Sequence, residues 1–310
     1  MAIKTLKEQN LTWINIDTVN DEALAFLKGN YSFHPLDLED IQSEQQTPKI
    51  DAYKNYLFVV MQFPQWQAAT NTVVAHEVDI FIGENYLITI QREKSKELKS
   101  LFYRCMNNRK VRSDWMSGSS GYLLYHIIEE LLHNAHPILN HIGKHISSLE
   151  NEIFAAEPNS IVIRELAIER RNVLSFRRIL DPERYVISSL KNTPKPFLPQ
   201  QADEGLTIYF DNIQDYLSNM WAVVESYKET INGLHITVES LINRRTNKII
   251  STLTMISVSF MPLTLLSGLY GMNIDHLPFA HEPHYVWLMY LGLFAVIVLT
   301  IFIMRRKRDI

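Results

Sequence analysis

Two long segments without a charged residue, both close to the C-terminus, constrain the fold of this 310-residue chain more than any other feature. They run from Ile249 to Leu269 and from Val286 to Met304. At about 1.5 Å per residue, each is long enough to cross a hydrocarbon layer of about 30 Å as a helix. The alternative is a core hairpin of a soluble protein, whose helices rarely stay uncharged for this length. The pattern therefore predicts a pair of transmembrane helices.

Basic residues on the flanks of the two segments predict their orientation. Arg244, Arg245 and Lys248 precede the first segment, and the basic residues 305–308 follow the second. The connecting residues 271–285 contain no lysine or arginine. By the positive-inside rule, both chain ends are expected in the cytoplasm and only the loop outside. The N-terminus shows no signal-peptide pattern, so the long N-terminal part is expected to stay in the cytoplasm. The two spans and their flanking charges predict a multi-pass protein of the plasma (inner) membrane.

Composition argues against two other classes of protein. The formal net charge is −4 and the basic residues do not cluster away from the membrane flanks, so no nucleic-acid partner is indicated. No nucleophile–base motif, Walker sequence or phosphate-binding glycine loop occurs, so neither an enzyme nor a cofactor is expected. The single cysteine, Cys105, fits a reducing compartment.

The first 118 residues have the pattern of a mixed α/β domain. Alternating or β-branched apolar residues predict strands, and a short turn at 83–85 predicts a hairpin between the last two of them. The expected strands are residues 11–16, 56–63, 78–82 and 86–90, and short helices are expected at 35–41 and 96–106.

From residue 119 the apolar spacing changes to three and four residues, which indicates helices. An antiparallel helical hairpin is expected over 119–200, with a break at 155–159 and a proline-rich turn at 193–199. Residues 201–248 then carry four apolar heptads, typical of a long stalk helix packed along others. No proline occurs from 203 to 261, so stalk and first span are expected to form one helix of about 60 residues, roughly 90 Å long. The remaining segments are the first span at 249–270, an outer loop at 271–285, a second span at 286–304 and a basic tail at 305–310.

The sequence Tyr270-Gly271-Met272-Asn273, placed where the first span ends, resembles the signature of the CorA family of divalent-cation transporters. Residues 260–264 resemble the first span of that family, and residues 38–41, 48–50 and 56–58 resemble its N-terminal domain. The resemblance implies an α/β cytoplasmic domain and a long helical stalk that continues into a two-helix transmembrane hairpin. It also implies a funnel-shaped homopentamer in the lipid bilayer. Its members carry Mg²⁺, some carry Co²⁺ or Ni²⁺, and a related branch carries Zn²⁺.

The resemblance further implies an ion pathway along one face of the first span. Helical spacing independently places the hydroxyls of Thr254, Ser257 and Thr264 on one face with Asn247, although such hydroxyls also bond to their own helix and serve packing. A ring of Asn273 amide oxygens could accept hydrogen bonds from the water shell that Mg²⁺ retains. By the resemblance, the selectivity filter is Gly271, Met272 and Asn273, and the pore is lined by Asn247, Ile250, Leu253, Ser257, Met261, Thr264 and Gly268, with an apolar constriction at Ile250 and Leu253.

The outer loop leaves the choice of ion open. Phe279 stands where the family often has a glutamate, so Asp275 and Glu282 are the only acids that could concentrate cations at the pore mouth. The same loop contains His276, His281 and His284, and imidazole suits Zn²⁺, Co²⁺ or Ni²⁺ better than Mg²⁺. A loop of surface histidines without a metal is the alternative. Three functions therefore stay open: passive Mg²⁺ uptake, transport of Zn²⁺ or a similar ion on the same architecture, and a non-conducting membrane-anchored scaffold.

Two groups of residues in the soluble part are further candidates for metal ligands. Family members sense cytoplasmic Mg²⁺ at acidic sites between subunits, and Asp211 and Asp215 are the stalk acids nearest that position. The segment 62–67 offers no acid as a partner, so a solvated acidic face is the alternative. His141 and His145 are spaced i, i+4 as metal ligands often are, with His133 and His136 one to two turns earlier. No cysteine or acid completes a site there, and a solvated or packed helix face is the alternative.

Overall fold

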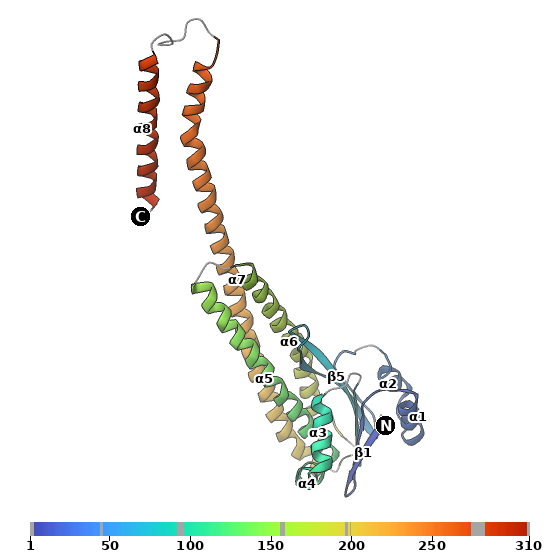
Figure 1. The fold of residues 1–310 in the computed structure, drawn as a ribbon. Helices are drawn as coiled ribbons and strands as arrows, with labels where there is room; N and C mark the ends of the chain where they lie inside the picture. Colours follow the sequence, from blue (N-terminus) through green and yellow to red (C-terminus); the bar gives the residue numbers. More distant parts are fainter. Residues whose placement is uncertain are drawn as a thin grey trace. The chain divides into compact units, whose positions relative to one another are not determined.

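The computed structural model describes residues 3–43, 46–91, 96–155, 159–195, 198, 200–273 and 283–308. The chain divides into two compact units, residues 1–235 and 236–310, each of which is described by itself. Figure 1 shows the order of the elements along the chain.

A six-stranded mixed sheet lies at the centre of the first unit, with the strand order β1-β2-β6-β5-β4-β3 (Figure 1). All neighbouring strands are antiparallel except β2 and β6, which run parallel. The strands are β1 (Ile3–Glu8), β2 (Leu11–Ile16), β3 (Lys49–Ala52), β4 (Tyr56–Gln67), β5 (Thr72–Gly83) and β6 (Tyr86–Gln91).

The strands predicted from the sequence are confirmed, but two are longer than expected. β4 continues to Gln67 and β5 begins at Thr72, because the two strands pair with each other along their whole length. Beyond Phe63 the residues no longer alternate as a strand should, and pairing with β5 holds them extended. Four short elements had no signal strong enough to predict them: β1, β3, α1 (Asp21–Asn30) and α4 (Arg109–Met116).

Both faces of the sheet are covered. Successive side chains of a strand point to opposite faces, and the neighbouring residues Trp13 and Ile14 of β2 are both buried. Ile14 belongs to the core under α1 and α2 (Pro35–Asp40), whereas the fully buried ring of Trp13 meets Phe102 of α3 (Lys96–Asn107) at 5.0 Å. In the first core, Phe81 stacks on Phe33 and Phe58, with ring centroids 4.1 and 4.6 Å apart. These aromatic contacts hold the two small helices on the sheet.

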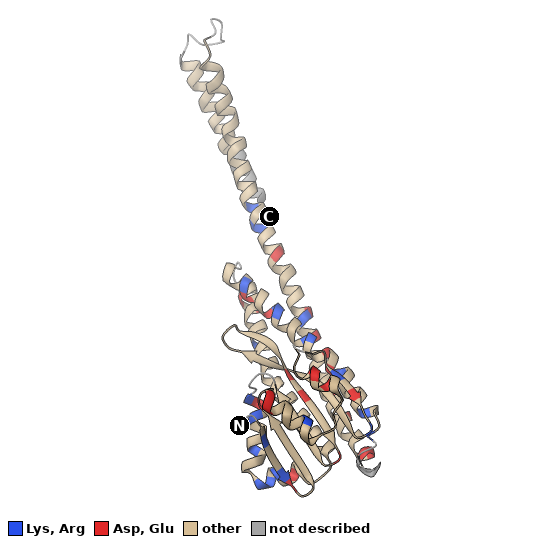
Figure 2. Ribbon diagram, turned by 90° about the vertical axis from the view of Figure 1, so that its right-hand side faces the viewer, with Lys and Arg blue, Asp and Glu red and all other residues tan. Residues whose placement is uncertain are grey.

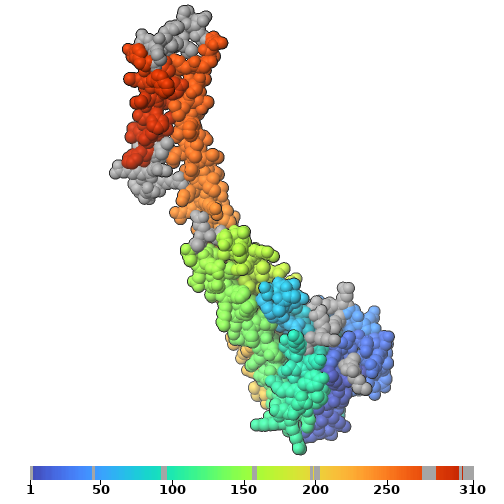
Figure 3. All heavy atoms as spheres, viewed as in Figure 1, coloured from blue at the N-terminus to red at the C-terminus, as the bar shows by residue number. Residues whose placement is uncertain are grey.

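The helical hairpin predicted from residue 119 is formed by α5 (Ser120–Ala155) and α6 (Ser160–Asn192). Asn159 caps α6, its side-chain oxygen accepting hydrogen bonds from the backbone N–H groups of Ile161 and Val162. α6 packs on β3, β4 and β5, and α5 packs on β4, β5 and β6. Figure 3 shows the light-blue tip of the β4–β5 hairpin against the green surface of these helices.

One helix, α7 (Gln200–Tyr270), contains both the stalk and the first span, which confirms the predicted continuity. It has 71 residues and continues through Pro262, beyond the stretch without proline on which the prediction rested. The apolar heptad positions Ile213, Leu217, Met220 and Val224 are buried, as their spacing predicted. In α5, Gly143 leaves room for Tyr227 of α7, because a Cβ at this glycine would lie 2.1 Å from the tyrosine oxygen.

The second unit contains the end of α7 and the helix α8 (Pro283–Arg308). Figure 2 shows both as uncharged ribbons over most of their length. α7 is long and apolar enough to cross a membrane, and none of its apolar window is buried within the structure. The apolar stretch of α8, among the residues whose side chains are described, is His284–Leu299.

A buried glutamate of α6 completes the edge of the sheet. β3 begins at Lys49, opposite Val60 of β4, so the N–H group of Gln62 lies beyond the strand pairing. Oε1 of Glu183 accepts the hydrogen bond from this N–H group at 2.6 Å. Glu183 is fully buried, and its Oε2 has no hydrogen-bond partner among the described residues. Burial raises the pKa of this carboxyl group well above its ordinary 4.5.

This shift predicts that Glu183 lowers stability as the pH rises. Because the folded-state pKa is the higher one, the protonated carboxyl group contributes fully below about pH 4.5 and that contribution is lost as the pH rises through the folded-state pKa. We therefore expect Glu183→Gln to raise the unfolding temperature at pH values above the folded-state pKa of Glu183. The unfolding temperature of this variant should also depend less on pH than that of wild type. The measurement is thermal unfolding from pH 5 to 9. The exposed Glu229→Gln is the control, and equal pH profiles for Glu183→Gln and wild type would contradict the prediction.

Candidate functional site

The proposed filter residues directly follow the last turn of α7. The N–H of Gly271 donates to the carbonyl of Ser267 at 2.9 Å, and the N–H of Met272 donates to Leu269 at 3.3 Å. Asn273 follows with an exposed side chain. The helix thus presents the asparagine amide at its C-terminal end, where backbone carbonyls are also left without helical partners.

Glycine is needed at position 271 because the backbone approaches itself closely. A Cβ there would lie 3.0 Å from the carbonyl oxygen of Ser267, which is tighter than ordinary packing. The residue does not adopt a positive φ, so the requirement is one of space and not of left-handed backbone. This differs from the usual glycine at a helix end, which is chosen for its left-handed conformation.

One face of the first span is covered by α8. The hydroxyl groups of Ser267 and Tyr290 lie 3.2 Å apart, and the two helices run beside each other (Figures 1 and 2). The half-buried residues of α7 recur at three- and four-residue spacing, as do those of α8. They are Met255, Ser259, Pro262, Leu263, Leu266 and Tyr270 in the first span of α7, and Val286, Tyr290, Leu293 and Ile297 in α8.

The predicted pore face lies on the opposite side of α7. Residues two apart on a helix are separated by about 200°, so Ser257 points away from the side marked by Met255 and Ser259. Ile250 and Leu253 expose 55% and 63% of their surface in the single chain. All seven residues predicted to line the pore are exposed: Asn247, Ile250, Leu253, Ser257, Met261, Thr264 and Gly268.

Two of the three hydroxyl groups on this face bond to their own helix, which is the alternative to facing a pore. Thr254 donates to the carbonyl of Ile250 at 2.9 Å, and Thr264 donates to Phe260 at 3.0 Å. The hydroxyl group of Ser257 makes no hydrogen bond with any described residue, while its backbone belongs to α7. Donation to the helix leaves the lone pairs of both threonine oxygens available to water, so the face stays polar.

The structure bears on only one of the candidate loop ligands. Asp275, His276, His281 and Glu282 lie outside the described residues. His284 is the second residue of α8, and its ring centroid lies 4.3 Å from that of Tyr285.

The stalk acids differ in how much of their charge is already compensated. Asp211 is paired with Lys191, with 2.5 Å between Oδ1 and Nζ. Glu225 is paired with both Lys228 and Arg177, and the hydrogen bond from Lys228 is the main reason that its pKa lies below the ordinary value. Asp215 is exposed and makes no ion pair with any described residue. Of the two acids predicted to regulate, Asp215 is therefore the one whose negative charge no described lysine or arginine compensates.

The sequence analysis did not identify a cluster of acids in the α/β domain, because its members are dispersed along the chain. Asp37, Asp40 and Asp51 bring carboxylate oxygens within 4.8 Å of one another. Lys49 already lies among them, with its Nζ 2.7 Å from Asp40 and 2.6 Å from Asp51. Asp37 accepts hydrogen bonds from two tyrosines, and burial raises its pKa. The lysine ammonium therefore compensates this cluster.

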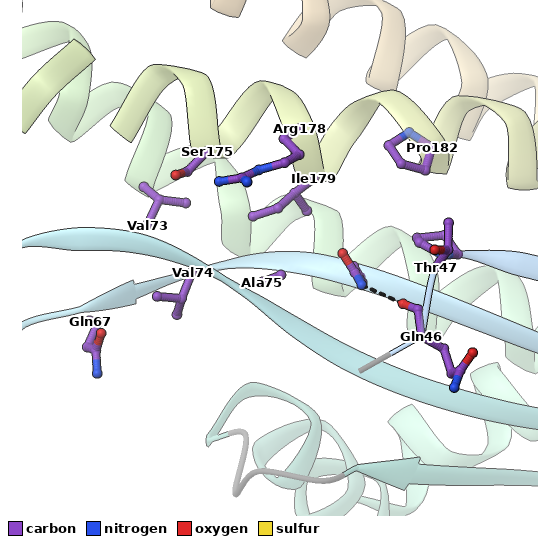
Figure 4. A pocket seen from close by; sticks show the side chains of 12 residues that line it. Gln46, Thr47, Gln67, Val73, Val74, Ala75, Ser175, Arg178, Ile179 and Pro182 are labelled. Atoms are coloured by element: carbon purple, nitrogen blue, oxygen red, sulfur yellow. Dashed lines mark hydrogen bonds between the residues drawn. The ribbon is translucent and has the colours of Figure 1, made fainter. Parts of the chain in front are cut away.

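A groove between α6 and the β4–β5 hairpin has a volume of about 680 Å³. Figure 4 shows Arg178 reaching from α6 above the strands, and a dashed hydrogen bond from the Gln62 amide to the Gln46 carbonyl, 2.7 Å long. The lining mixes amides, hydroxyls and apolar side chains around a single charged group. None of its described lining residues provides the carboxylates that a divalent cation needs.

Comparison with known proteins decides the family. The model of the family described as "CorA-like Mg2+ transporter protein" matches residues 8–307. The chain belongs to this family. It is a divalent-cation transporter of the CorA type and not an enzyme, as the sequence predicted.

Two relatives and one solved structure support this assignment. The chain is 28% identical to the cobalt/magnesium transport protein CorA of Thermotoga maritima over 301 residues, covering 94% of this chain and 82% of that protein. It is 26% identical to the protein of the same name in Methanocaldococcus jannaschii over 304 residues, covering 98% and 92%. The structure of the complete CorA magnesium transporter from M. jannaschii matches with a TM-score of 0.79 at 24% identity, over 97% of this chain and 92% of the other. The α/β sheet followed by a long helix with an apolar end is therefore the fold of this family.

Proposed function

We propose that five copies of this chain assemble around the exposed face of the first span and form a passive uptake pathway for Mg²⁺ in the plasma (inner) membrane. Both termini lie in the cytoplasm. The observation that carries the proposal is the separation of two faces on α7. One is covered by α8, and the other is exposed in the single chain and carries Asn247, Ser257 and Thr264. Polar groups within a membrane normally face a bundle interior or water.

In this assembly the exposed face surrounds the axis and α8 lies outside it. Ile250 and Leu253 form an apolar ring able to close the pathway by excluding water. Asn273 presents neutral amide oxygens to the hydrated ion, and carboxylates at the same place would hold Mg²⁺ too tightly to release it. No chemical step is needed, because a divalent cation entering the cell gains about 2.3 kcal/mol per charge for each 100 mV of membrane potential.

The proposal is tested by particle images and by cation uptake. Images of the purified full-length protein should show five-fold symmetry with the first spans innermost. A two-fold or three-fold assembly, or a central α8, would overturn the pore arrangement. Liposomes containing the protein should take up Mg²⁺ when a gradient is imposed. A parallel panel with Zn²⁺, Co²⁺ and Ni²⁺ separates the Mg²⁺ pathway from a transition-metal pathway, and a lack of uptake of every ion would support the scaffold.

We further propose that cytoplasmic divalent ions close the pathway through the acidic side of the stalk. Five copies bring the carboxylates together, and their repulsion favours separation of the stalks unless divalent ions bridge them. Because Lys191 compensates Asp211, Asp215 should contribute the larger share.

Replacing Asp211 and Asp215 together by asparagine is expected to weaken inhibition by internal Mg²⁺, and Asp215→Asn alone should produce most of the effect. The measurement is flux against internal Mg²⁺ concentration for wild type, both single variants and the double variant. Glu84→Gln, which changes an exposed acid in the turn between β5 and β6 and outside the stalk, is the control. Superimposable inhibition curves for wild type and the double variant would mean that these acids are a solvated surface.

A further inference from the structure

The paired histidines of α5 have a carboxylate partner that comes from another helix. His145 Nδ1 lies 3.2 Å from Oε1 of Glu169 in α6, a residue 24 positions later in the chain. The ring of His141 lies beside that of His145, with centroids 4.3 Å apart, and packs edge-on against Trp66. The fold therefore brings an acid, Glu169, to the pair of histidines whose spacing suggested a metal site.

His145 and Glu169 face a pocket of about 250 Å³ between α5, α6 and the turn that joins β4 to β5. Glu152 from α5 and Glu165 from α6 also line it, and Glu165 shares a helix face with Glu169 because the two are four residues apart. No lysine or arginine is among the lining residues, which are Asn71, His145, Ser148, Leu149, Glu152, Glu165, Ile168 and Glu169.

The carboxylate of Glu169 is buried without a permanent positive charge beside it. Only 4% of the residue is exposed, and no described lysine or arginine forms an ion pair with it. Its partners are the imidazole of His145 and the amide of Asn172, whose Nδ2 donates to Oε2 at 3.3 Å. Buried carboxylates are normally paired with a cation or bound to a metal, and a neutral imidazole supplies a hydrogen bond but no charge.

Asn172 fixes the position of this carboxylate and of the pocket wall. Its Nδ2 also donates to the carbonyl of Asn71 at 3.2 Å, and its Oδ1 accepts from the N–H of Val73 at 3.2 Å. One side chain thus ties the β4–β5 turn to α6 and orients Glu169. Such a hydrogen bond to a ligating carboxylate is the second-layer support that metal sites use to hold their ligands.

We propose that this pocket binds one divalent transition ion of the Zn²⁺, Co²⁺ or Ni²⁺ class through His145 Nδ1 and Glu169, with Glu152 and Glu165 able to complete the coordination. Two donors that each lie about 2.1 Å from one ion are separated by roughly 3.0–3.4 Å at octahedral to tetrahedral angles. The 3.2 Å between Nδ1 and Oε1 lies within this range, so an ion can take the place of the hydrogen bond once the two side chains turn toward it. Glu152 and Glu165 are exposed side chains that can reorient toward it.

The mixed ligand set favours transition ions over Mg²⁺, because imidazole is a good ligand for the former and Mg²⁺ prefers oxygen and water. The site belongs to the first unit, whereas the residues proposed to conduct belong to the second, and it does not depend on the transport proposal. An ion here would link α5, α6 and the sheet.

Binding of Co²⁺ to the full-length protein in detergent tests the proposal, with excess Mg²⁺ present to occupy oxygen-rich sites. Co²⁺ is the probe because its visible absorption reports nitrogen ligation. Wild type is compared with His145→Ala and Glu169→Gln, and His136→Ala, another exposed histidine of α5, is the matched control. His145 is half exposed, so its replacement should not unfold the chain.

We expect wild type and His136→Ala to bind one more Co²⁺ per chain than His145→Ala, with the difference visible in the absorption spectrum. Glu169→Gln should weaken binding by about 10- to 100-fold, and Zn²⁺ should compete. Zn²⁺ should also raise the unfolding midpoint of wild type but not of His145→Ala, because a ligand that binds only the folded state stabilises it. Equal Co²⁺ stoichiometry and spectra in all four proteins would overturn the site, whatever the outcome for transport.

Discussion

Asn273→Ala is expected to abolish Mg²⁺ flux while the assembly remains intact. The side chain is exposed immediately after the last turn of α7, so its loss removes an amide from the mouth of the pathway without opening a cavity. A ring of methyl groups cannot accept hydrogen bonds from the water shell of Mg²⁺, and the ion gives up that shell reluctantly. We expect flux into liposomes to fall to the level of empty vesicles.

The matched control for this variant is Asn219→Ala, which removes an exposed asparagine from the stalk part of α7, outside the first span. It should conduct like wild type. Asn273→Asp keeps a side-chain oxygen but adds a negative charge, so it tests whether the filter must be uncharged. If carboxylates bind the ion too tightly, this variant should bind Mg²⁺ but conduct poorly. Wild-type flux from correctly assembled Asn273→Ala would exclude the residue from the filter.

Phe81→Ala is expected to have the largest effect on folding, destabilising the first unit by about 3–5 kcal/mol. The ring is completely buried and stacks on both Phe33 and Phe58. Truncation removes the transfer free energy of the ring and leaves a cavity between the sheet and the helices α1 and α2. The change is measured as a shift in the denaturant midpoint of the full-length protein, followed by tryptophan fluorescence.

Phe154→Ala is a chemically identical control near the end of α5, where the ring is 68% exposed. It should shift the midpoint little, because an exposed ring loses almost no buried area on truncation. Similar shifts for the two variants would mean that burial does not account for the effect of Phe81. Because Phe81 lies outside the second unit, we expect no change in ion selectivity of the fraction that remains folded.

Helices and spans could be predicted well because their signals are local. A 3.6-residue period can be recognised within a few turns, so the heptads from Ile213 onward and the uncharged run to Leu269 were sufficient to predict one long helix. The proposed filter residues came from the resemblance of residues 270–273 to the CorA signature, and their place at the end of that run supported it. Charge on the flanking residues predicted the orientation by the same local reasoning.

The short elements could not be predicted in the same way. β3 has four residues, and its strand conformation depends on pairing with β4. The parallel pair of β2 and β6 joins segments about 70 residues apart, as in the register of Thr12 with Tyr86. Such pairing is decided by the faces that other elements bury, and a short apolar run contains no information about its neighbour.

The sequence by itself determined that this chain has an α/β body, a continuous stalk and an apolar helical pair, because periodicity and charge are properties of neighbouring residues. Only the tertiary structure decided which face of α7 is covered by α8, that Lys191 compensates Asp211, that Glu183 meets the edge of the sheet, and that Glu169 meets His145. Each of these depends on side chains that packing brings together from different elements. Their energies come from burial and from distances of a few ångströms, which the order of residues along the chain does not contain.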